Sequence, residues 1–514
     1  MIQNLQVEVA TISSKDNIEI IKTTTTSTIT AATISSNIDE DINILSKKMA
    51  KRIVTFRPRS SQLDRETLET QQDQFRGFFT LFWIGMAFYI IQTGVKNFVS
   101  AGVLFNLSFF RLFSQDASGL ILSDACMIGS MFFAVFLQKL ISKELIRWKY
   151  VGMIIQHIYQ ILFLFVPIYW TFLKNWPWVQ SGFFVLHTIS MLMKLHSYSF
   201  YNGELSEWAL RLKSLKRDYF TLIGESKKSD NSEDSEDSEE SEESEENEKE
   251  NICQKQEAIN QLKLKIDQVE GYLNSPAGNI RYSDNITIMN FIDFLLVPTL
   301  VYELEYPRTD KIRPWYLLEK LAAIFGTFFL LYVNTGTHII PVLPNVSTSI
   351  LDCMLQMLFP FMVNYLLLFY ITFECICNFF AELTRFADRN FYDDWWNSTT
   401  WDEFARKWNK PVHRFLLRHV YQFSIESYKL SKRDATFMTF FLSSLIHELV
   451  MVVVSKKFRM YLFCFQMLQL PLIALSKLPL IKDKKWFGNG FFWLGLFLGP
   501  PILGILYCRE VFMQ

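Results

Sequence analysis

The feature that most limits the fold of this chain is the recurrence of apolar stretches about 20 residues long. Half of the 514 residues are hydrophobic, and 48 are Phe. A helix of about 20 apolar residues is long enough to cross a bilayer. We therefore predict an all-α polytopic membrane protein of about nine transmembrane helices. The predicted spans are residues 78–100, 119–141, 151–173, 179–200, 316–340, 349–381, 433–456, 458–478 and 487–509.

The basic residues that flank these spans predict their orientation. Lys and Arg cluster between residues 47 and 65, just before the first span, and such residues are enriched on the cytosolic side. We therefore predict a cytosolic N-terminus and, after nine spans, a luminal C-terminus. Loop 334–350 contains no Lys or Arg, which fits a luminal position. The basic residues at 456–459 fall on the luminal side against the rule.

Polar regions accompany the spans. Residues 1–75 are rich in Thr and Ser and lack the pattern of a cleavable signal peptide, so we predict a disordered cytosolic region. Residues 225–251 form an acidic insert, which contains thirteen acids and one Lys between 229 and 250. Such a segment repels itself, and we predict that it is disordered and cytosolic. Its acid-flanked serines are either kinase sites or part of a plain spacer.

Two shorter helices are predicted beside the spans. Residues 252–274 carry apolar positions three, four and seven apart, which indicates an amphipathic helix. That helix either docks on the membrane domain or pairs with another subunit. Residues 288–300 are apolar but too short to span, which favours an interfacial or re-entrant helix ending at Pro298. The apolar positions of the first helix are Ile252, Ile259, Leu262, Ile266, Val269 and Leu273.

One histidine lies where a span is predicted. His447 sits in the apolar sequence TFFLSSLIHELVMVVVS, and a polar side chain at membrane depth is costly. The bland explanation is a polar residue satisfied at a helix–helix contact. The functional one is a general base, for which imidazole is the usual group. Ser443 lies one turn earlier on the same face and is a candidate to orient the ring.

Residues 391–397, FYDDWWN, form a polar and aromatic block between spans, called the heptad below. Tryptophans at a membrane interface explain part of it, because indoles gather there. A belt of aromatic residues does not explain two acids and an amide in the same block. Asn397 offers an uncharged donor for an oxyanion or carbonyl, and Trp396 can exclude water.

Several functional classes are disfavoured. The seven cysteines are scattered without a CxxC pair, so we predict no disulfide framework and no metal site. No Gly-rich nucleotide-binding loop or GxSxG elbow occurs, which disfavours nucleotide hydrolysis and serine-hydrolase chemistry. We predict no nucleic-acid partner. His157, His187 and His338 are interpreted as structural.

The heptad and His447 together resemble the membrane-bound O-acyltransferases, in the branch of sterol and diacylglycerol acyltransferases. Phe391, Tyr392, Asp394, Trp395 and Asn397 match the FYxDWWN signature of that branch, and His447-Glu448 matches its intramembrane histidine. The resemblance implies a membrane-bound O-acyltransferase catalytic domain over residues 76–510. Lys194 and His196 lie in a Lys-x-His-Ser element similar to that of sterol acyltransferases, which favours a sterol over diacylglycerol as acceptor.

The resemblance implies a mechanism in which a long-chain acyl-CoA enters from the cytosol and a sterol from the bilayer. His447 removes the proton of the 3β-hydroxyl, which attacks the thioester directly. Asn397 positions the reacting groups or stabilises the oxyanion, Trp396 lines the same chamber, and Ser443 supports the histidine. No cofactor is implied, because acyl-CoA is a substrate. Lys194, His196, His413, Arg414 and Arg418 are candidates for substrate binding.

Further expectations follow from the same resemblance. The product is a steryl ester for storage, the location is the endoplasmic reticulum membrane, and the assembly is a homodimer or homotetramer in contact with membrane lipids. Two alternatives stay open: a diacylglycerol O-acyltransferase that makes triacylglycerol, and a lipid-binding membrane protein without enzymatic activity.

Overall fold

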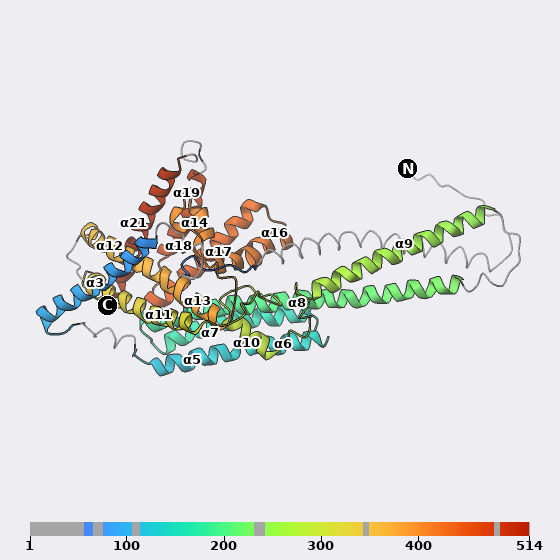
Figure 1. Ribbon diagram of the computed structural model, residues 1–514, viewed down its shortest axis with the longest axis horizontal. Coiled ribbons are helices and arrows are strands. Elements are labelled where there is room, and N and C mark those ends of the chain that lie inside the picture. Colours follow the sequence, from blue (N-terminus) through green and yellow to red (C-terminus); the bar gives the residue numbers. More distant parts are fainter. Residues whose placement is uncertain are drawn as a thin grey trace, which may run out of the picture. The chain divides into compact units, whose positions relative to one another are not determined.

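The computed structural model describes residues 56–64, 76–104, 114–230, 242–342, 349–476, 478 and 484–512. Helices dominate these residues, and their only β pairing consists of three isolated bridges. Figure 1 labels the helices and colours them along the sequence, from blue at the N-terminus to red at the C-terminus. The chain divides into two compact units. Unit 2 contains Phe56–Glu204 and Ser283–Gln514, and unit 1 contains Leu205–Tyr282 with the N-terminal residues.

Among the residues that the structure describes, six helical segments are long and apolar enough to cross a membrane, which confirms the all-α membrane fold. They correspond to six of the nine predicted spans. The segments are Ala117–Ser142 (α5, Ala117–Ser130, and α6, Phe132–Ser142), Trp148–Leu173 (η1, Trp148–Gly152, and α7, Met153–Leu173), Pro314–Ile339 (α11, Pro314–Asn334, and η3, Thr335–Ile339), Leu351–Leu383 (within α12, Ile350–Phe369, η4, Tyr370–Ile376, and α13, Cys377–Leu383), Lys432–Ser455 (α17) and Lys485–Cys508 (within α21, Lys485–Phe512).

The other three predicted spans also fall on helices, but these are not among the six segments. Residues 78–100 lie in α3 (Arg76–Ala101), and 179–200 form the first part of α8 (Trp178–Asp230), which continues far beyond a membrane thickness. Residues 458–478 hold two short helices, α18 (Tyr461–Met467) and α19 (Gln469–Ser476). A count of nine spans therefore stays a prediction for these segments.

The short apolar segment 288–300 forms α10 (Ile288–Leu296). The side chain of Thr287 caps it by accepting a hydrogen bond from the backbone N–H of Asn290 at 3.2 Å. The helix ends as predicted before Pro298, because a residue that precedes proline disfavours the helical conformation and Val297 is extended.

The segments around the heptad form short helices and turns. In chain order they are η5 (Trp395–Asn397), α14 (Trp401–Trp408), α15 (Lys410–Leu416), η6 (Leu417–Gln422) and α16 (Phe423–Ser427). Thr400 caps α14 by accepting from the backbone N–H of Glu403. Asn409 caps α15 by accepting from that of Val412. Side-chain caps of this kind separate short helices that would otherwise run together.

Unit 1 is a two-helix hairpin of the C-terminal part of α8 with α9 (Glu242–Leu273), which lie side by side (Figure 1). Lys216 pairs with Glu270 at 2.6 Å, and Trp208 contacts Tyr272. The predicted apolar seam is buried in this hairpin, at Ile259, Leu262, Ile266, Val269 and Leu273. The seam packs on α8 of the same chain, whereas the two predicted alternatives were docking on the membrane domain and pairing with another subunit.

The acidic insert differs from its prediction at both ends. Residues 225–230 continue α8, and α9 begins at Glu242, so 242–251 are helical as well. Acidic residues are favourable in the first turns of a helix, because they lie at the positive end of its dipole. Residues 231–241 lie outside the described residues.

Part of the N-terminal region predicted to be disordered is held in unit 2. Residues 56–64 contact the segment that precedes the heptad, through a β-bridge between Arg59 and Asp388. The prediction of disorder is corrected for these nine residues, because buried side chains anchor them. Residues 1–55 and 65–75 lie outside the described residues.

Candidate active site

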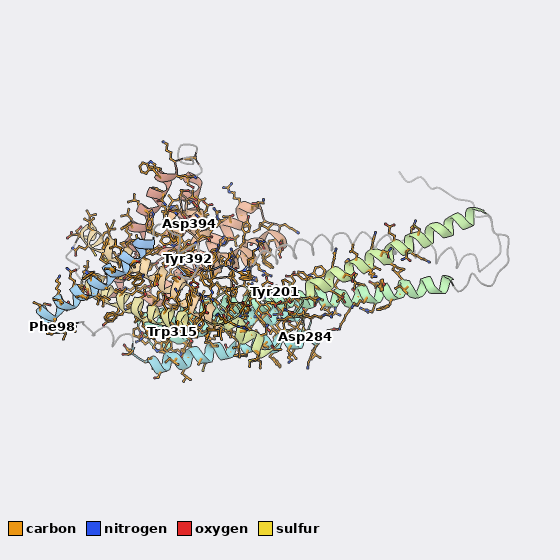
Figure 2. The ribbon with its side chains drawn as sticks, viewed as in Figure 1. Phe98, Tyr201, Asp284, Trp315, Tyr392 and Asp394 are labelled. Carbon is orange, nitrogen blue, oxygen red and sulfur yellow. The ribbon has the colours of Figure 1, made fainter. Side chains whose placement is uncertain are left out.

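The aromatic half of the heptad forms a packed support. Phe391, Tyr392 and Trp395 are all 2% exposed or less. The Trp395 ring lies 4.8 Å from Trp408 and 5.1 Å from Phe369, both in edge-on geometry. Tyr392 lies near Asp394 in the helical body (Figure 2) and packs on Phe369 at 4.7 Å. These rings fix the backbone from which the polar residues of the heptad project.

The two acids of the heptad are paired with lysines from the segment that follows it. Asp393 contacts Lys410 at 2.6 Å, and Asp394 contacts Lys407 at 2.9 Å. Lys407 also pairs with Glu403 at 2.8 Å. Burial alone would raise the pKa of Asp394, but hydrogen bonds from Lys407 and Asn397 lower it below its usual value. Asp394 is therefore ionised at neutral pH, and the two acid–lysine pairs join the heptad to the segment that follows it.

Asn397 and Trp396 end the heptad at η5. The Asn397 side chain is exposed, and its amide donates a long hydrogen bond of 3.4 Å to Asp394. The Trp396 carbonyl accepts hydrogen bonds from Asn489 Nδ2 at 2.9 Å and Trp493 Nε1 at 3.1 Å. Helix α21 thus holds the heptad through its backbone, which leaves the amide of Asn397 available.

Two glycines of α21 allow this close approach. A Cβ atom at Gly488 would lie 2.7 Å from the carbonyl oxygen of Thr399, and one at Gly495 would lie 2.6 Å from the Trp401 ring. Both separations are shorter than a carbon atom tolerates, so a side chain at either position would push the heptad region away from α21.

Buried polar atoms next to the heptad have no partner among the residues that the structure describes. They are Trp395 Nε1, Ser398 Oγ and Trp401 Nε1. Each of these groups can donate a hydrogen bond, and a buried donor without an acceptor is costly. The three donors are suited to bind acceptor oxygens of a ligand or of water.

His447 lies in α17 with an exposed side chain. Its Nδ1 is 2.7 Å from the backbone carbonyl oxygen of Ser443. A carbonyl can only accept, so Nδ1 carries a hydrogen and the Nε2 of a neutral ring keeps its lone pair. Ser443 therefore orients the imidazole through its backbone carbonyl. The free Nε2 is the atom that a general base requires.

Glu448, the neighbour of His447, has a different role. It is 2% exposed, and its carboxylate accepts from the backbone N–H groups of Met460 at 2.8 Å and Phe463 at 3.0 Å. The Tyr507 hydroxyl of α21 donates to it as well, at 2.9 Å. Glu448 thus ties α17 to the start of α18 and to α21. The sequence signal for this anchor is an acid inside an apolar helix.

The two motifs are attached to α21 at different levels. Trp493 holds the heptad, and Tyr507, fourteen residues further along, holds Glu448 beside His447. Fourteen residues of helix rise by about 21 Å. No hydrogen bond joins the heptad to His447 in the part of the chain that the structure describes. Helix α21 is therefore a common support for the two motifs.

The Lys-x-His-Ser element of α8 holds neighbouring segments together. Lys194 donates to the carbonyls of Phe294 at 2.8 Å and Val297 at 2.7 Å, and so caps the end of α10. His196 stacks on Phe200 at 4.2 Å. Ser197 Oγ accepts from the backbone N–H of Tyr302 at 2.8 Å and lies 2.8 Å from His419 Nε2. In this structure the element supports loop 297–302.

The basic candidates near the heptad are partly engaged with acids. Arg414 pairs with Asp388 at 3.2 Å, and Arg418 pairs with Glu303 at 2.5 Å. Burial, together with neighbouring Arg406, Lys410 and Arg414, lowers the pKa of His413 below its usual value. His413 is therefore neutral at pH 7, and each of these neighbouring cations is itself paired with an acid.

Comparison with known proteins agrees with these motifs. Residues 162–509 match the membrane-bound O-acyltransferase family. A probable sterol O-acyltransferase 1 of Schizosaccharomyces pombe is 38% identical over 88% of this chain and 85% of its own length. Sterol O-acyltransferase 2 of Saccharomyces cerevisiae is 37% identical over 86% of this chain and 68% of its own.

A relative with another acceptor is similar over a shorter stretch. Diacylglycerol O-acyltransferase 1 of Dictyostelium discoideum is 34% identical over 50% of this chain and 42% of its own length. The family match covers the heptad, His447 and α21 together. The chain therefore belongs to the membrane-bound O-acyltransferase family.

Proposed function

We propose that this protein transfers a long-chain acyl group from acyl-CoA to the 3β-hydroxyl of a sterol. Relatives named as sterol O-acyltransferases match most of the chain, whereas the diacylglycerol enzyme matches half of it. The observation that carries the chemistry is the tautomer of His447, whose Nδ1–H is used by the Ser443 carbonyl. Its Nε2 takes the hydroxyl proton while the oxygen attacks the thioester carbonyl, and CoA leaves as the thiolate.

The heptad binds the polar part of acyl-CoA in this proposal. The exposed amide of Asn397 and the unpartnered donors of Trp395, Ser398 and Trp401 offer partners for its carbonyl oxygens. In this proposal an extended pantetheine arm reaches from the heptad to a thioester held near His447. We assign Asn397 and Trp396 to binding and orienting acyl-CoA; stabilisation of the oxyanion by Asn397 is the alternative role.

The proposed location is the endoplasmic reticulum membrane, with a cytosolic N-terminus and a luminal C-terminus. The loop after α7 and the loop after α17 are both luminal in this topology, and the Lys456 side chain, in the second loop, contacts Asn175 in the first. This contact supports a common side for the two loops despite the basic residues at 456–459. We further propose a homodimer or homotetramer, on the resemblance alone.

The function is tested by the release of CoA from purified full-length protein. We expect release when a long-chain acyl-CoA and a sterol are supplied together, and only background hydrolysis with acyl-CoA alone. Release with diacylglycerol but not with sterol would overturn the proposed acceptor and favour triacylglycerol synthesis. No release with either acceptor would favour a lipid-binding protein.

A further inference from the structure

Residues 56–64, called the N-terminal strap here, run beside the segment that leads into the heptad. The backbone N–H of Arg59 donates to the Ala387 carbonyl at 2.9 Å, and the N–H of Arg389 donates to the Arg59 carbonyl at 2.9 Å. Arg389 precedes Phe391 by two residues. The strap therefore fixes the backbone immediately before the heptad.

A buried carboxylate makes this attachment specific. Asp388 is fully buried, and Arg59 donates to both of its oxygens at 2.9 Å. Arg414 contacts the same carboxylate at 3.2 Å. A two-pronged guanidinium pair is among the stronger polar contacts in proteins, and removal of one partner leaves a buried charge poorly compensated.

A second carboxylate joins the strap to the heptad itself. Glu374 in η4 is fully buried, and its Oε2 accepts from Ser61 Oγ at 2.7 Å and from the Tyr392 hydroxyl at 3.1 Å. Lys320 holds the other oxygen at 3.0 Å. One residue of the strap and one of the heptad thus share a single carboxylate oxygen.

Contacts at the two ends complete the attachment. Asp64 pairs with Arg313 at 3.1 Å at the start of α11. Phe56 packs edge-on against Tyr306 at 5.4 Å and Phe386 at 5.9 Å. The strap is thus anchored at both ends and twice in between, by residues 249 to 330 positions away in the sequence.

We propose that the N-terminal strap is a positioning element of the acyl-CoA site: Arg59 and Ser61, through Asp388 and Glu374, hold the heptad where it binds acyl-CoA. This inference rests on the proposed function for its consequence in turnover, but not for the structural coupling itself. Arg59 and Ser61 touch no reacting atom and act only through the heptad.

The coupling is tested in the full-length protein by hydrogen exchange read by mass spectrometry. The substitutions Ser61→Thr and Ser61→Val introduce side chains of the same shape and differ by the hydroxyl. We expect Ser61→Val to raise exchange at 386–397 about tenfold over Ser61→Thr, with α17 unchanged. Ser60→Ala, at the exposed neighbour, should match the wild type. Equal exchange at 386–397 in the Thr and Val variants would overturn the proposal.

Turnover provides a second readout. We expect Ser61→Val to raise the KM for acyl-CoA about tenfold while kcat stays within about twofold, and Ser61→Thr to restore the wild-type KM. A loss of kcat without a change in KM would contradict a positioning role at the acyl-CoA site. If the wild type shows no sterol-dependent release of CoA, the proposed function fails, while the exchange experiment still decides the coupling.

Discussion

The heptad and His447 are supported in opposite ways. Buried rings, two acid–lysine pairs and α21 hold the heptad, whereas the His447 ring has one recorded hydrogen bond, to a carbonyl of its own helix. A binding site needs many fixed contacts, because each shifted donor loses a ligand oxygen. A general base needs one free nitrogen with the correct tautomer. The contrast fits the proposed roles, which are recognition of acyl-CoA by the heptad and proton transfer by the histidine.

The largest effect is expected from the substitution His447→Ala, which tests the role of the histidine in this comparison. Loss of the only proposed base should lower kcat by about 10²–10⁴-fold with little change in the KM for acyl-CoA. The matched control is His157→Ala. His157 is also exposed and also lies 2.7 Å from the carbonyl four residues earlier, so it shares the geometry of His447 without the assigned role. Equal activity in the two variants would remove His447 from the mechanism.

The next largest effect is expected on stability, at Glu448. Glu448→Ala leaves two backbone N–H groups and the Tyr507 hydroxyl without their acceptor, at a cost of about 2–4 kcal/mol. Thermal unfolding in detergent should show a melting temperature lowered by several degrees. Tyr507→Phe removes one of these contacts and should lower it less. An unchanged melting temperature in Glu448→Ala would mean that contacts other than those of Glu448 hold α18 and α21 against α17.

Asn397→Ala sharpens the comparison by separating binding from chemistry. We expect the KM for acyl-CoA to rise about tenfold and kcat to stay within about threefold, because the proposed role of the side chain is to bind the polar part of the substrate. Steady-state kinetics with varied acyl-CoA at saturating sterol measure both values. Asn390→Ala, outside the heptad, is the comparison variant. A fall in kcat of a hundredfold without a change in KM would return Asn397 to the oxyanion.

The smallest effect concerns pH. The Asp394 pKa is held below its usual value of 3.8, so its pair with Lys407 stabilises the heptad at neutral pH. That contribution is present above the unfolded pKa and is lost as the pH falls through the lower folded pKa. Asp394→Asn should therefore be slightly less stable than the wild type at pH 7, by at most about 1 kcal/mol for such an exposed pair. The difference should shrink as the pH falls below 3.8 and disappear only below the lower folded pKa. A difference that persists there would exclude the ion pair as its cause.

Much of this arrangement could be predicted from the sequence, because its signals are local. Apolar periodicity over about 20 residues locates spans, and the heptad and His447 are short motifs in unusual surroundings. The apolar seam of α9 could also be predicted, although the helix on which it packs, α8, could not. Residues 225–230 and 242–251 are helical, although their composition predicts disorder. Composition does not show that an adjacent helix extends into a polar segment.

The parts that could not be predicted depend on contacts distant in the sequence. Arg59 and Asp388 are 329 positions apart, and nothing in the polar sequence around Arg59 indicates a buried partner. The contact of His447 with the Ser443 carbonyl likewise depends on the side-chain rotamer of the histidine, which the residue type does not reveal. Which residues of α21 contact each motif could not be predicted either, because these contacts depend on how the helices pack.

The central claim, an acyl-CoA extended from the heptad to His447, is tested most directly by photocrosslinking. Two acyl-CoA analogues are needed, one with a photoreactive group on the adenine and one with the group next to the thioester. We predict that the first labels 391–408 and the second labels α17 between 443 and 451, as mapped by mass spectrometry. Labelling of the heptad by both analogues, with none in α17, would contradict the account.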